Sequence, residues 1–211
     1  MLLVALAAAQ AALVSSLAAP FPVDVDKWFS ADDYPDDLIS YKQTAFQPVT
    51  QTLVGIDGKM IGCRVETASP NPQVDALACA IIMKRGRFQP ARWTDGSAVP
   101  GVYRWPVSFM LDGYLYEPFS DIELQVDRLP DKRKSEFVTV EFASDANGKI
   151  QDCVGQHPVR QTDRPANPQL VSIACNTVQT EWKPFTVLGT DGKPSRSVQN
   201  VIVKFSTKKP R

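Results

Sequence analysis

Hydrophobic and polar residues follow a strand pattern and then a helix pattern in the first half of the chain. Residues 51–56 alternate between the two classes, which is typical of a β-strand with one buried face. Asp57-Gly58 then favours a tight turn, so residues 60–66 are expected to return as a second strand. Apolar residues next recur on one helical face, at Val74, Leu77, Ala78, Ile81 and Ile82. Residues 103–111 alternate again, which predicts a closing strand.

The second half of the chain repeats this order of patterns. DGKMIGC (57–63) matches NGKIQDC (147–153), and NPQVDALAC (71–79) matches NPQLVSIAC (167–175). In each NPQ motif the Asn can cap a helix and the Pro suits its first position. The NPQ motifs lie 96 residues apart, a period too long for a solenoid. We therefore expect an α+β fold of two tandem β-β-α-β domains, residues 20–112 and 113–211, each with a small antiparallel sheet packed on one helix.

The four cysteines, Cys63, Cys79, Cys153 and Cys175, form no C-x-x-C motif, so a zinc knuckle or a thioredoxin-type site is not indicated. Three disulfide pairings are possible. We favour Cys63–Cys79 and Cys153–Cys175, because each predicted unit then has a bridge between its second strand and its helix. A bridge closing a loop of this length stabilises the fold by about 3 kcal/mol in the chain-entropy model.

Residues 1–19 are uncharged and largely apolar, and they end in Ser-Leu-Ala-Ala before Pro20. This pattern predicts a signal peptide cleaved after Ala18 or Ala19, although it lacks a basic start. A retained membrane anchor is the alternative. Either interpretation places the remaining chain outside the cytosol, where cysteines form disulfides.

Composition and motifs argue against catalysis. The chain has 23 Lys and Arg and 23 Asp and Glu, so its net charge gives no case for nucleic-acid binding. The single histidine, His157, lies in a polar stretch without an evident partner. We found no nucleophile elbow, nucleotide-binding loop or zinc-protease motif. We therefore expect no enzyme activity, no catalytic residue, no cofactor, no metal site and no small-molecule substrate.

An ordered set of motifs between residues 28 and 111 resembles the C-terminal domain of TonB, the periplasmic energy transducer. The set comprises Tyr34-Pro35, a G-K-x-x-x-C strand, a helix, R-x-R-F-x-P at 85–90, an Asp-Gly turn and a V-x-F strand. Residues 121–207 resemble a more diverged copy. The cysteines indicate a subgroup of this family, and the few residues between Ala19 and Trp28 leave no room for the transducer's long spacer.

This resemblance implies a periplasmic protein-binding module, which adds a peptide or a segment of an outer-membrane transporter to a sheet edge. It makes Tyr34 and Pro35 candidate contacts. The closing strand is the expected acceptor, and Pro106 would interrupt it in the first unit. We therefore expect either that residues 198–205, with Val201, Val203 and Phe205, accept the partner, or that the two units pair with each other. A membrane-anchored transducer component and a structural envelope protein without a peptide ligand are the alternatives.

Overall fold

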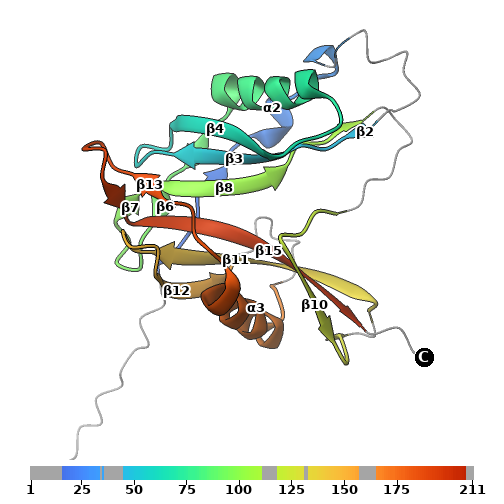
Figure 1. Ribbon diagram of the computed structural model, residues 1–211, viewed down its shortest axis with the longest axis vertical. Coiled ribbons are helices and arrows are strands. Elements are labelled where there is room, and N and C mark those ends of the chain that lie inside the picture. The colour runs from blue at the N-terminus through green and yellow to red at the C-terminus, as the bar shows by residue number, and fades with distance from the viewer. Residues whose placement is uncertain are drawn as a thin grey trace, which may run out of the picture.

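A computed structural model describes residues 16–33, 35, 45–110, 118–130, 133–156 and 165–207. The fold is mixed α and β, as expected, and the longest strands of the described chain are gathered in one seven-stranded sheet (Figure 1). The strand order is β12-β11-β15-β8-β3-β4, and β10 pairs with β15 beside this path. The strands are β3 (Val49–Val54), β4 (Met60–Thr67), β8 (Gly101–Pro106), β10 (Ile122–Val126), β11 (Ser135–Ser144), β12 (Ile150–Gly155) and β15 (Ser197–Thr207).

Shorter elements surround this sheet. Four two-residue pairs are β1 (Phe21–Pro22) with β5 (Phe88–Gln89), β2 (Ala45–Phe46) with β9 (Phe109–Met110), β6 (Ala91–Arg92) with β7 (Ala98–Val99), and β13 (Val187–Leu188) with β14 (Pro194–Ser195). Two single-turn 3-10 helices, η1 (Val25–Lys27) and η2 (Ala31–Asp33), lie near the start of the described chain.

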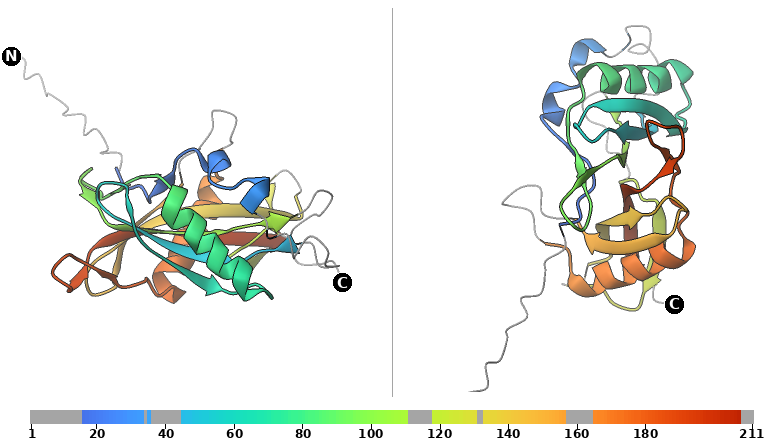
Figure 2. Two further views of the ribbon diagram at one scale, coloured as in Figure 1. Left: turned by 90° about the horizontal axis from the view of Figure 1, so that it is seen from above. Right: turned by 90° about the vertical axis from the view of Figure 1, so that its left-hand side faces the viewer.

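Two α-helices begin at the predicted NPQ motifs, α2 (Pro72–Arg85) and α3 (Pro168–Glu181). The side chains of Asn71 and Asn167 each accept hydrogen bonds from the main-chain N–H groups two and three residues later. These bonds satisfy donors that a helix start otherwise leaves unpaired, which fixes both boundaries. The right-hand view in Figure 2 shows α2 and α3 at opposite ends of the molecule, with strands between them.

The predicted hairpin turns and disulfides are confirmed. Gly58 and Gly148 have φ values of 78° and 80°, a left-handed conformation that a side chain disfavours. Cys63–Cys79 joins β4 to α2, and Cys153–Cys175 joins β12 to α3. Each bridge therefore fastens a strand to the helix that covers it.

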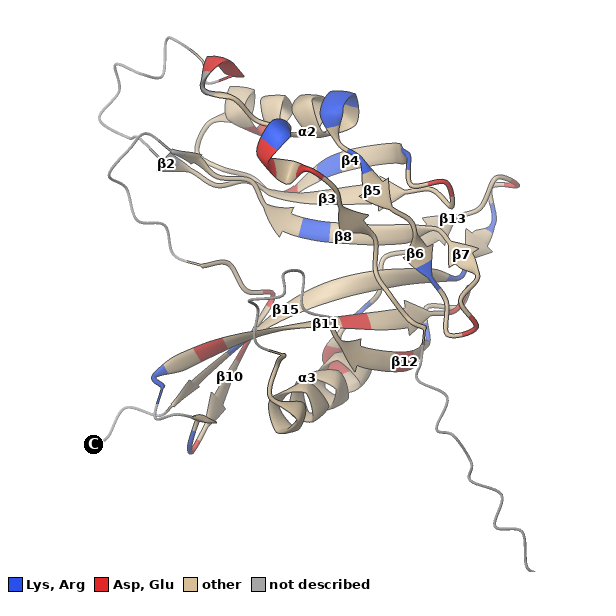
Figure 3. Ribbon diagram, turned by 180° about the vertical axis from the view of Figure 1, so that it is seen from behind, with Lys and Arg blue, Asp and Glu red and all other residues tan. Residues whose placement is uncertain are grey.

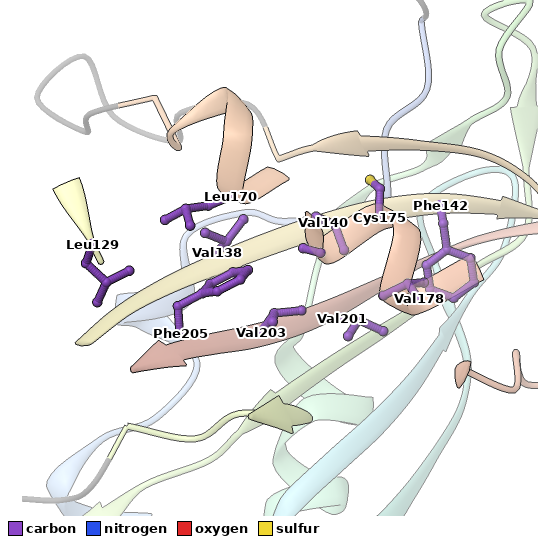
Figure 4. Packing of buried hydrophobic residues seen from close by; sticks show 11 residues of the cluster. Leu129, Val138, Val140, Phe142, Leu170, Cys175, Val178, Val201, Val203 and Phe205 are labelled. Atoms are coloured by element: carbon purple, nitrogen blue, oxygen red, sulfur yellow. The ribbon is translucent and has the colours of Figure 1, made fainter. Parts of the chain in front are cut away.

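Each helix covers its own hydrophobic cluster. Beneath α3, buried side chains of β11 and β15 meet Leu170, Ala174 and Val178 (Figure 4). Beneath α2, the buried residues are Phe46, Val74, Ala78, Ile81, Ile82, Val107 and Phe109. The apolar helix positions expected from the sequence therefore include these core contacts.

The sheet continues across the expected domain boundary at residue 112. The chain runs through β3, β4, α2 and β8, and later through β11, β12, α3 and β15. β8 and β15 lie side by side and in parallel, with Gly101 opposite Val198 and Val102 opposite Gln199. One shared sheet thus replaces the separate small sheet that was expected in each unit.

The expected cleavage point lies within a packed segment. Leu17 and Ala19 are buried in a cluster with Trp93, and Ala18 exchanges two main-chain hydrogen bonds with Arg92. Residues 1–15 lie outside the described part of the chain. Within that part, neither helix has the length and apolar character needed to span a membrane.

Candidate functional site

The Tyr-Pro region is only partly described. Tyr34 lies outside the described residues, and Pro35 is half-buried. Beside them, the Arg85 guanidinium at the end of α2 binds both carboxylate oxygens of Asp33, at 2.5 and 2.9 Å. These bonds lower the pKa of Asp33 to about 2. The arrangement fastens the segment just before Tyr34 to the α2 helix.

The second set of expected contacts is in the core. Val201, Val203 and Phe205 are each 0% exposed and pack beneath α3. Their strand, β15, pairs with β11 along one side and with β8 and β10 along the other. The expectation that this strand offers a free acceptor edge is therefore wrong. The other branch of that expectation, that the two halves pair with each other, matches the contact between β8 and β15.

β8 and β15 pair directly only at their first residues, and beyond these residues side chains bridge the two strands. We call this contact between the two halves the junction. The Asn200 side chain accepts from the Arg104 main-chain N–H at 2.9 Å and donates to its carbonyl at 3.2 Å. Further along β15, Asp121 exchanges two hydrogen bonds with the main chain of Ile202. β10 then begins at Ile122 and pairs with β15 directly. These contacts satisfy main-chain groups that the diverging strands would otherwise leave buried and unpaired.

Arg104 connects the two halves electrostatically. Its side chain is 6% exposed and forms ion pairs with Glu66 on β4 and with Asp121. Its guanidinium carbon also lies 5.0 Å from the Trp182 ring and 5.6 Å from the Phe185 ring. Burial raises the pKa of Asp121, and the nearby Arg104 charge opposes that increase. The junction therefore depends on a buried charge that has its partners in place.

Three strands of the large sheet pair on one side only among the described residues: β4, β10 and β12. On β4, register identifies the groups that point outwards. The Asn200 side chain on β15 binds the main-chain N–H and C=O of Arg104, so these two groups point away from β3. Gln51 lies opposite Arg104 on β3, and its own main-chain groups therefore point to β4, where Gln51 pairs with Arg64. The next residues on either side, Cys63 and Val65, therefore direct their N–H and C=O groups away from the sheet. We call this side the outer edge of β4.

The corresponding edge of β12 is partly satisfied by its own side chain. The main-chain N–H of Gln156 donates to the Thr139 carbonyl on β11. Main-chain groups of successive residues in a strand point to opposite sides, so the N–H of Cys153, three residues earlier, points away from β11. The carboxylate of Asp152 accepts from that N–H at 2.8 Å. The motif alignment places Gly62 where the second half has Asp152, so β4 has no such side chain. The two edge strands therefore differ at the position that decides whether an outward donor is already bound.

A cavity of about 440 Å³ adjoins β4 on the face opposite α2. Cys63 bonds to α2, so its neighbours Gly62 and Arg64 must lie on this opposite face. Segment 185–187 of the second half forms the facing wall. Arg64 donates to the Gln51 side chain, and its guanidinium carbon lies 5.1 Å from the Phe185 ring. The cavity thus combines an apolar wall, a glycine and an exposed guanidinium beside the outer edge of β4.

Gly62, Arg64 and Arg104 were not among the site residues predicted from the sequence. The contrast between Gly62 and Asp152 is visible when the two motifs are aligned, but its meaning depends on which N–H groups point outwards. The cavity depends on contact between residues more than 100 positions apart. No local pattern carries that information.

Charge distribution and cysteine chemistry give the setting of this site. Charged residues of both signs are scattered along the ribbon, with no field of a single sign among the described residues (Figure 3). The two disulfides fit an oxidising, extracytoplasmic compartment. Comparisons of the chain with protein-family models, curated proteins and solved structures give no match.

Proposed function

We propose that this protein is an exported, periplasmic binding module similar to the C-terminal domain of TonB, with two diverged copies in one chain. Its ligand is an extended protein segment, such as the periplasmic segment of an outer-membrane transporter, and it binds by adding a strand to β4. The observation that carries the proposal is the outer edge of β4, where the main-chain groups of Cys63 and Val65 face outwards beside a cavity.

Strand addition suits this edge physically. An added strand would exchange up to four main-chain hydrogen bonds with Cys63 and Val65, while side-chain pockets would supply selectivity. Register shifts flank the segment, one between Met60 and Gly62 and one between Val65 and Thr67. They leave residues 62–65 as a regular stretch, which suits a short ligand. The disulfide holds Cys63, at the centre of this stretch, against α2.

β4 replaces β15 as the proposed acceptor because β15 has partners on both sides. β10 and β12 are less suited. The cavity beside β4 has no lining residue from β10, and on β12 the Asp152 carboxylate already binds an outward N–H. Tyr34 and Pro35 stay candidate contacts by resemblance alone.

The test is peptide binding to the full chain, with a decapeptide from the periplasmic segment of an outer-membrane transporter as the probe. Val65→Pro removes one outward N–H, and proline is tolerated at a strand edge facing solvent. Val65→Ala is the matched control, because it shortens the same side chain and keeps the N–H. We expect calorimetry to show binding to the wild type and to Val65→Ala, and a loss of at least tenfold in Val65→Pro. Equal binding by all three chains would contradict strand addition at β4.

A structural envelope protein without a peptide ligand is the second candidate. The register shifts favour it, because bulges are one way in which proteins protect exposed sheet edges from unwanted pairing. Failure of transporter-derived peptides to bind the wild-type chain would support this second function.

A further inference from the structure

The geometry of β4 determines where the side chains of an added strand would point. Arg64 and Gly62 form hydrogen-bonded pairs with β3, so towards a strand on the outer edge they occupy the non-hydrogen-bonded positions. Cross-strand side chains approach most closely at such positions, with Cβ atoms about 4.5–5.5 Å apart. The ligand residues opposite Arg64 and Gly62 would therefore lie on the cavity face, two positions apart.

The position opposite Arg64 favours an acidic side chain. The nearby carboxylates of Glu66 and Asp121 are both bound by Arg104. Among the described residues, no carboxylate lies within ion-pair distance of Arg64, and its guanidinium contacts the Gln51 amide and the Phe185 ring. An exposed guanidinium that forms no ion pair within the described chain complements a carboxylate on the ligand, and it repels an ammonium group.

The position opposite Gly62 favours an apolar side chain. A Cβ built on Gly62 would find one heavy atom within 4 Å, the Leu53 Cβ at 3.7 Å, so space remains above this glycine. The apolar lining includes Leu53, Val102 and Val187. Since Gly62 brings no side chain of its own, the ligand's side chain can occupy this volume.

We propose that Arg64 and Gly62 determine specificity for a ligand strand with an acidic residue and an apolar residue separated by one position. Antiparallel pairing is the more stable arrangement per residue, and it places the acidic residue first. This inference rests on the proposed function, because it assumes that the ligand binds as a strand on β4.

The test uses three octapeptides that differ only at their centres: Glu-Ser-Val, Lys-Ser-Val and Glu-Ser-Ser. We expect the wild-type chain to bind the first about fivefold more tightly than the second, as for a cross-strand ion pair worth the upper end of its usual range. Loss of the apolar side chain in the third should weaken binding about tenfold.

Two variants assign these preferences to residues. Arg64→Glu should reverse the order of the Glu and Lys peptides, and Arg64→Gln should remove it. Gly62→Val fills the cavity without a backbone clash, since Gly62 is not among the left-handed glycines, and it should make the first and third peptides bind alike. The exposed position of Arg64 makes its substitutions compatible with folding.

The outcomes separate the inference from the proposed function. Equal binding of the Glu and Lys peptides, still abolished by Val65→Pro, would overturn the specificity assignment and leave strand addition intact. A charge preference that is insensitive to Val65→Pro would instead overturn strand addition. If none of the three peptides bound the wild-type chain, both the specificity assignment and strand addition at β4 would be contradicted.

Discussion

Replacement of Arg104 with Met tests the buried junction between the two halves. The substitution retains much of the apolar stem and removes the guanidinium. It leaves Asp121, whose side chain is 0% exposed, without its cation, and it also frees Glu66. Removing one partner of a buried ion pair typically costs about 3–5 kcal/mol, because the remaining charge is buried without compensation. We expect the free energy of unfolding at pH 7 to fall by about 3 kcal/mol, near the lower end of this range, since Glu66 is partly exposed and can be hydrated.

The pH dependence gives this prediction its sign. Burial already raises the pKa of Asp121 in the folded chain, and loss of Arg104 removes the opposing influence. Folded Arg104→Met then holds a proton on Asp121 more tightly than the unfolded chain does. The stability deficit of the variant should therefore shrink as the pH falls from 7 towards 4.

Urea unfolding, followed by tryptophan fluorescence, measures these effects at both pH values. Trp182 provides a local signal because it lies against the Arg104 guanidinium. Asp121→Asn added to Arg104→Met serves as the matched control, and it should recover part of the loss at pH 7 by removing the stranded charge. The buried-charge explanation would be refuted if Arg104→Met lowered the free energy of unfolding by less than about 1 kcal/mol at pH 7. It would also be refuted if neither the lower pH nor the added Asp121→Asn substitution restored any of the lost stability.

Three further predictions concern other buried groups. Burial raises the pKa of Glu141 to about 7, so the folded state holds this proton more tightly than the unfolded state and stability falls from about pH 5 to 7. In the wild type, the unfolding free energy should fall by about 2–3 kcal/mol between pH 5 and 8 because of this group. In Glu141→Gln, the unfolding free energy measured over the same range should lose that dependence. Leu17→Ala, in a chain starting at Ser16, should cost about 2–4 kcal/mol, because Leu17 is 0% exposed; an unchanged melting curve would show that this segment does not pack. Replacing Cys63 and Cys79 together with Ser should cost about 3 kcal/mol in urea unfolding, and mass spectrometry of the unreduced wild type should recover their linked peptides.

Features encoded by neighbouring residues were predictable. Asn71-Pro72 and Asn167-Pro168 mark the helix starts because capping involves residues two and three positions away. The Gly58 turn is equally local, and the disulfide pairing follows once a strand and a helix are expected to carry one cysteine each.

The place of β15 in the sheet was not predictable by the same means. Alternation at Val201, Val203 and Phe205 correctly indicated a strand with a buried face, but this pattern does not reveal which strands lie beside it. Pro106 was expected to interrupt the first closing strand, and it is the last residue of β8. The candidate site depends on long-range pairing of this kind, which turns Cys63 outwards and brings the second half against Gly62.

Amide hydrogen exchange of the full chain, measured residue by residue by NMR, tests the central claim most directly. In the free protein, the amides of Cys63 and Val65 should exchange rapidly, while those of Gly62 and Arg64 are protected by β3. Addition of the transporter-derived decapeptide should slow exchange at Cys63 and Val65 and leave Gly62 and Arg64 as they were. Protection of Cys63 and Val65 in the free chain, or peptide-induced protection confined to another strand, would contradict binding at the outer edge of β4.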